Sequence, residues 1–149
     1  MYKNNHKNER GQSIVLIAIA MIALIAFVSL AIDGGMAYTQ RRIAQNAADS
    51  AAISATFEIR MQNRSTDSNA RSQPAVLAEI KEAVVAHGVV YDEEHVAAYY
   101  TDALGAQLST CKVGSCPTTV MNNAWGVRVN VSKPFSTFFA GVIGWHKMT

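Results

Sequence analysis

The two cysteines are the first residues whose spacing suggests chemistry. Cys111 and Cys116 have four residues between them, whereas a thioredoxin-like site places two residues between its cysteines. A zinc site needs further ligands, and the sequence offers no second cysteine pair and no nearby histidine pair. In an oxidising compartment the spacing favours a small disulfide loop. Free thiols and a metal site are the alternatives.

A second candidate cluster joins two histidines and three carboxylates. His87 and His95 flank Asp92, Glu93 and Glu94, and these side chains are metal ligands in many proteins. They fall on a predicted helix end and a turn, so we interpret them as a solvated acidic turn. The chain also has no nucleophile motif, phosphate-binding glycine loop or Ser/His/Asp set with recognisable spacing. We therefore predict no catalytic, cofactor-binding or metal site, and no enzyme.

The element with the clearest sequence signal is an apolar run near the start of the chain. Residues 11–32 contain no charged residue and no histidine, although 16% of the whole chain is charged. Residues 13–32 span roughly 30 Å as a helix, which matches a hydrocarbon core. Their twelve Ile, Leu, Val and Phe residues contribute about −4 to −7 kcal/mol to insertion. We predict an uncleaved transmembrane helix; a buried core helix and a cleaved secretory signal are the alternatives.

Charge around this run predicts the orientation of the chain. Lys3, Lys7 and Arg10 precede the run, and Asp33 follows it. The positive-inside tendency makes residues 1–12 a cytoplasmic tail and places the rest outside an inner or plasma membrane. The lipid bilayer is thus the first predicted partner. A net charge of +2 without a basic block argues against nucleic acid.

After the membrane segment we predict a membrane-proximal helical extension over residues 33–61. Asp33, Gly34 and Gly35 could kink it, because glycine is unfavourable inside a helix. From residue 36 to residue 61 there is no glycine or proline, and small residues recur at helical spacing. This seam can pack on the chain's own domain or on another helix. Its members are Ala37, Ala44, Ala48, Ala51, Ala55 and Ile59.

Residues 62–149 are predicted to form a small extracytoplasmic domain, which makes the fold class α+β. Residues 63–73 are polar and read as a loop, and Pro74 then opens a helix that Gly88 stops. Short strands are expected at residues 89–91, 96–101 and 125–131, the last with clear alternation. Residues 104–120 are rich in turn formers, and residues 135–145 suggest a short helix or turn.

The residues around the apolar run resemble the N-terminal region of TadG-like proteins, within the TadE/TadG family. The matching positions are Gly11, Asp33, Gly34, Tyr38, Arg42, Gln45, Asn46, Ala47, Ala48, Asp49, Ala51 and Ala52. The resemblance implies a single-pass envelope protein associated with the assembly of bacterial Flp (tight adherence) pili, without catalysis. It implies a small pilin-like domain, with other pilus-assembly proteins or further copies of the chain as partners. It also implies that a natural C-terminal strand is missing.

One departure from the pilin pattern separates two roles. Pilin-like proteins cut by prepilin peptidase carry a glutamate five residues after the cleavage glycine, and here Leu16 follows Gly11 at that distance. We therefore expect an unprocessed assembly component. The alternative is a polymerising pseudopilin whose apolar helix lies in a filament core. A membrane-anchored binding protein or hydrolase is the second alternative.

Overall fold

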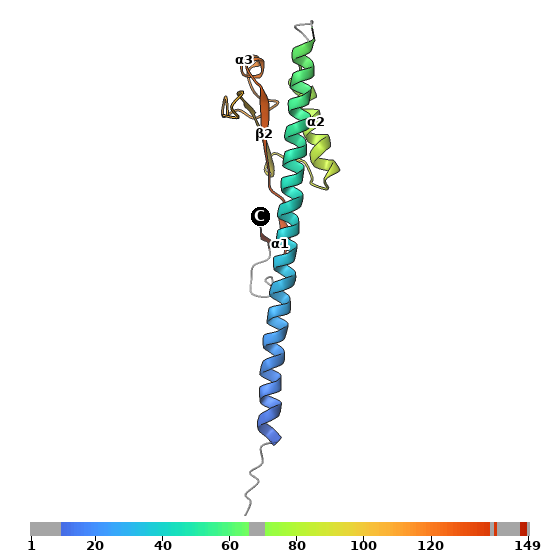
Figure 1. Ribbon diagram of the computed structural model, residues 1–149, viewed down its shortest axis with the longest axis vertical. Helices are drawn as coiled ribbons and strands as arrows, with labels where there is room; N and C mark the ends of the chain where they lie inside the picture. Colours follow the sequence, from blue (N-terminus) through green and yellow to red (C-terminus); the bar gives the residue numbers. More distant parts are fainter. Residues whose placement is uncertain (1–9, 66–70, 138, 140–146, 149) are drawn as a thin grey trace, which may run out of the picture. The chain divides into compact units, whose positions relative to one another are not determined.

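A computed structural model describes residues 10–65, 71–137, 139 and 147–148 (Figure 1). The chain divides into two compact units. The apolar unit joins Met1–Ala37 and Phe135–Met148, and the core unit joins Tyr38–Pro134 and Thr149. One helix, α1, runs through the boundary between them, and the predicted α+β class is confirmed.

Helix α1 spans Arg10–Arg64, a length of 55 residues. It stays α-helical through Asp33, Gly34 and Gly35, so the glycine pair does not interrupt it. Each glycine costs only about 1 kcal/mol relative to alanine, and a helix propagates readily once it is nucleated. The helix also continues past the expected end at residue 61.

Helix α2 spans Gln73–Ala86 and begins where cap chemistry predicts. The Ser72 side chain accepts a hydrogen bond from the Ala75 N–H at 3.4 Å, and proline follows in the first turn. Gly88 has a φ of +71°, which is the left-handed conformation that ends helices. The predicted helix between Pro74 and Gly88 is therefore confirmed.

Strands β1 (Val96–Thr101) and β2 (Gly126–Val131) form an antiparallel pair, with Val96 opposite Val131 and Thr101 opposite Gly126. Both were expected. The expected strand at residues 89–91 is absent, since these residues lie in the loop after α2. The turn-rich stretch instead contains a short helix, α3 (Thr118–Asn122).

In the apolar unit, β3 (Phe135–Ser136) pairs antiparallel with β4 (Lys147–Met148). The prediction of a helix or turn over residues 135–145 is thus wrong at its start. A two-residue strand is defined by its partner, which sequence periodicity does not reveal. Residues 138 and 140–145 of that prediction lie outside the described part of the chain.

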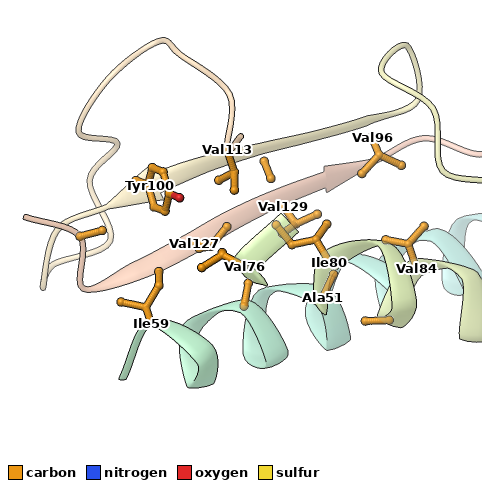
Figure 2. Packing of buried hydrophobic residues seen from close by; sticks show 14 of the residues in the cluster. Ala51, Ile59, Val76, Ile80, Val84, Val96, Tyr100, Val113, Val127 and Val129 are labelled. Carbon is orange, nitrogen blue, oxygen red and sulfur yellow. The ribbon is translucent and has the colours of Figure 1, made fainter. Parts of the chain in front are cut away.

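The hydrophobic core lies between the β1–β2 sheet and the helices α1 and α2 (Figure 2). Alternate residues of both strands are buried, as a sheet with one covered face requires. Val76, Ile80 and Val84 of α2 are fully buried, and Ala51 and Ile59 of α1 lie among the same cluster. Packing in this core holds α1, the sheet and the surrounding loops together.

Candidate functional site

The apolar segment of α1 exposes its hydrophobic side chains all around the helix. Every large apolar residue from Ile14 to Leu30 is more than half exposed, and Phe27 reaches 73%. Among the described residues, one helix is long enough and apolar enough to cross a membrane, and it contains this segment. An exposed apolar surface of this length is unstable in water. The segment fits the hydrocarbon core of a bilayer, which accepts such side chains on every face.

Asp33 follows directly after this segment, and its carboxylate is held inside the apolar unit. The residue is only 9% exposed, and the N–H of Phe139 donates to it at 3.2 Å from Oδ2. A buried carboxylate requires such donors because it has lost its hydration. Asp33 belongs to the family motif, but the sequence alone assigns it no role, since no local pattern predicts a backbone donor 106 residues away.

From Ala44 to Ile59 the predicted alanine seam lies in the core unit and is largely buried, with one change of position. Ala51, Ala55 and Ile59 are at most 2% exposed, and Ala44 is 8% exposed. Ala47 is fully buried, whereas Ala48 and Ala37 are half-buried. The seam therefore passes through Ala47, because that position faces the core cluster of α2 and the sheet. The chain's own domain covers the seam in the core unit.

The polar part of the family motif lies on the opposite side of α1. Arg42, Gln45, Asn46 and Asp49 are exposed, and so is Tyr38 at 71%. Further along the same helix, two large apolar side chains are also exposed, Ile53 at 71% and Phe57 at 65%. The motif is thus divided between a buried alanine face and an exposed polar face.

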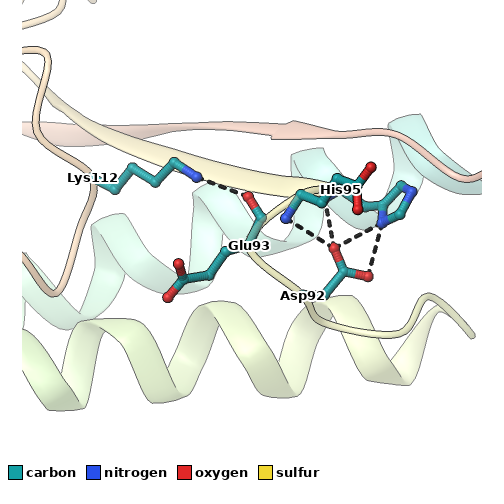
Figure 3. Close-up of polar contacts among 5 residues, drawn as sticks. Asp92, Glu93, His95 and Lys112 are labelled. Carbon is teal, nitrogen blue, oxygen red and sulfur yellow. Dashed lines mark hydrogen bonds and ion pairs between the residues drawn. The ribbon is translucent and has the colours of Figure 1, made fainter.

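The acidic turn is organised around Asp92 (Figure 3). Its Oδ1 accepts the backbone N–H groups of His95 at 2.6 Å and Glu94 at 3.0 Å, and it lies 2.7 Å from His95 Nδ1. These contacts, led by the His95 backbone N–H, lower the pKa of Asp92. Within the described ranges, no three His, Cys, Asp or Glu side chains gather as a metal site would require.

Cys111 and Cys116 form a disulfide, with Cα atoms 5.3 Å apart. The loop that they close packs on the sheet, since Val113 is buried and its N–H donates to the Ala98 carbonyl at 2.9 Å. Lys112 reaches back to the acidic turn, where its Nζ donates to the Glu93 carbonyl at 2.8 Å. The disulfide thus shapes a turn beside the strands.

A cleft at the other end of the sheet was not predicted from the sequence. It has a volume of about 550 Å³ and lies between the last turns of α1, the end of α3 and the residue before β2. No local sequence pattern marks this cleft, because the two groups of residues that line it are about sixty positions apart in the sequence. Its lining comprises Arg60, Asn63, Arg64, Asn122, Ala124 and Trp125.

Comparisons with known proteins agree with the N-terminal features. Residues 11–63 match the family described as "Flp pilus-assembly TadE/G-like". Neither the curated proteins nor the solved structures contain a match to the chain. The matched range covers most of α1, including the apolar segment, Asp33 and both faces of the motif. The resemblance noted in the sequence is therefore confirmed: residues 11–63 of this chain are similar to the TadE/G-like Flp pilus-assembly family.

Proposed function

We propose that this protein is a membrane-anchored, non-catalytic component of a Flp pilus-assembly or secretion apparatus. One observation carries the proposal: the residues that match the family include the segment from Ile14 to Leu30, whose large apolar side chains are all exposed. Residues 13–32 cross the inner or plasma membrane, and residues 33–61 form the membrane-proximal extension. Residues 62–149 form the extracytoplasmic domain, which contacts other assembly proteins.

The proposed orientation rests on charge and on the disulfide. Lys3, Lys7 and Arg10 favour a cytoplasmic N-terminus. The bond between Cys111 and Cys116 favours an oxidising compartment for the other side, because reduced thiols prevail in the cytosol. Both observations support an extracytoplasmic location of the core unit.

The membrane role is tested by charging the apolar segment. In the double variant Ile22→Arg/Ile25→Arg, each substitution replaces a residue that favours membrane insertion by one that opposes it. Together they raise the free energy of insertion by about 6–8 kcal/mol. That cost matches or exceeds the about −4 to −7 kcal/mol that the segment supplies. We expect the wild-type chain to float with liposomes on a density gradient and the double variant to stay at the bottom.

A matched control places the same charges outside the segment. Ile53→Arg/Phe57→Arg alters two exposed apolar residues of the same helix, and this variant should float as the wild type does. If the segment variant floats equally well, residues 13–32 are not the membrane anchor. If the control variant also sinks, added charge itself prevents flotation, and the anchor assignment loses its support.

The alternative role, a polymerising pseudopilin, requires removal of the residues before Gln12. The exposed apolar helix suits a filament core as well as a bilayer, so the mature N-terminus decides between the roles. Mass spectrometry of the protein from a bacterial host with an active prepilin peptidase should give a chain beginning at Met1. A chain beginning at Gln12, found in sheared filaments, would establish the pseudopilin instead.

A further inference from the structure

The cleft beside Trp125 has the chemistry of a binding site for acidic peptide. We propose that it receives an acidic segment of a partner protein, with carboxylates at the arginines and an apolar side chain at the indole. This inference rests on the proposed function in one respect, since a non-catalytic assembly component needs a surface that its partners recognise. All residues that line the cleft belong to the core unit.

The cleft concentrates positive charge that the described residues leave uncompensated. Arg60 and Arg64 line it, and within the described part of the chain neither guanidinium has a carboxylate within ion-pairing distance. A third arginine, Arg71, contacts a residue of the lining, since its Nη1 donates to the Asn122 carbonyl at 3.4 Å. Guanidinium groups pair with carboxylates through parallel hydrogen bonds. An acidic ligand would therefore supply the missing counter-charge.

The indole holds one of these arginines in place. The Arg60 guanidinium lies 4.9 Å from the centre of the Trp125 ring, a distance at which a cation is attracted to the ring face. The backbone of Trp125 is fixed in turn, because its N–H donates to the Thr101 carbonyl at 2.8 Å. Trp125 as a whole nevertheless remains 52% exposed. Tryptophan and arginine held in this way are the residue types that dominate protein interfaces.

The remaining polar groups suit a peptide better than a phosphodiester. Asn63 and Asn122 each carry an amide that both donates and accepts. Peptide groups use both functions, whereas an ionised phosphodiester accepts hydrogen bonds only. The volume of about 550 Å³ also falls within the range of roughly 300–1,000 Å³ that is typical of ligand sites. Charge complementarity and hydrogen bonding thus point to the same partner chemistry.

The test measures peptide binding to the full-length chain in detergent micelles. Trp145→Phe leaves Trp125 as the single tryptophan, because the chain has two. The probe is acetyl-Asp-Glu-Phe-Glu-Asp-amide, and its neutral counterpart is acetyl-Asn-Gln-Phe-Gln-Asn-amide. We expect the acidic peptide to shift the Trp125 emission saturably and to bind more weakly as salt is added. The neutral peptide should bind at least about tenfold more weakly.

Variants then locate the binding. Arg60→Gln and Arg64→Gln should each weaken binding by about tenfold or more. The control Arg41→Gln/Arg128→Gln removes two positive charges elsewhere in the core unit and should stay within about twofold of the wild type. If the double variant Arg60→Gln/Arg64→Gln is too unstable to fold, the two single variants still test the binding site.

Several results would overturn the inference. Equal binding of the neutral peptide, or equal weakening in the control variant, would show that the cleft does not recognise carboxylates. Inorganic phosphate that displaces the peptide at equal concentration would assign the cleft to a general oxyanion. Liposome flotation of the same Trp145→Phe protein separates the two proposals, because failed peptide binding with intact flotation refutes the cleft and leaves the membrane role standing.

Discussion

Ala47 and Ala48 are adjacent alanines whose environments differ, which allows a sharp test of how α1 packs. Ala47 is fully buried in the core cluster, whereas Ala48 is half-buried. Ala47→Leu forces three extra carbon atoms into a packed interior, and such overpacking costs about 1–3 kcal/mol. Ala48→Leu has room toward solvent, and its effect should stay within about 0.5 kcal/mol. We therefore expect only the first substitution to destabilise the core unit.

Thermal unfolding of the full-length chain in micelles provides the measurement. In a Trp145→Phe background, Trp125 reports on the core unit, where it lies just before β2. About 1 kcal/mol corresponds to about 4–8 °C in the Tm of a domain of this size. Ala47→Leu should thus lower the Tm by at least about 4 °C, and Ala48→Leu by less than that.

Two outcomes would refute this account of the seam. An equal or larger loss in Ala48→Leu would show that the helix is rotated relative to the described packing. A loss in Ala47→Leu that shrinks on dilution would show that the seam packs against another copy of the chain, because dilution then removes the same intermolecular contact from the wild type.

Three further predictions address single groups in the core unit. Tyr100 is 1% exposed, and burial raises its pKa to about 12. Its hydroxyl has no hydrogen-bond partner among the described residues. Tyr100→Phe should therefore leave the Tm unchanged or raise it by an amount that corresponds to at most about 1 kcal/mol of stability, and a clear fall in the Tm would contradict the burial of an unpaired hydroxyl. The pKa of Asp92 is lowered from 3.8 in the folded chain, so its stabilising effect is present above that value and disappears as the pH falls through the lower folded pKa. The Tm difference between wild type and Asp92→Asn should shrink correspondingly below about pH 4, and a difference independent of pH would refute the role of the His95 contacts. Reduction of the bond between Cys111 and Cys116 opens a ring of only a few residues and should cost about 2 kcal/mol, measured as a Tm shift with and without reductant.

Elements whose residues carry their own signal were predictable from the sequence. Helix α2 has a serine cap, a proline in its first turn and a glycine after its end. Strand β2 alternates buried valines with exposed residues. By contrast, α3 has only five residues, and Pro117 caps it without a side-chain hydrogen bond. Such a helix is stabilised by its surroundings, and so periodicity does not detect it.

The site residues show the same division between local and long-range information. The spacing of the cysteines predicts a disulfide, because the two residues lie close along the chain. The phase of the alanine seam is not local, since both Ala47 and Ala48 suit a helix and only α2 and the sheet select one. The cleft is least predictable, because Arg60 and Trp125 lie far apart in the sequence and come together only in the folded chain.

The two faces of the family motif have different physical explanations. Folding explains the alanines, because Ala47 and Ala51 allow α1 to approach α2 and the sheet closely. Folding does not explain Arg42 and Asp49, which are exposed and form no hydrogen bond or ion pair within the described residues. Exposed polar side chains on a helix contribute little to stability. The fold of the core unit therefore requires only one face of the motif, and substitutions on the other face should alter contacts with other molecules before they alter stability.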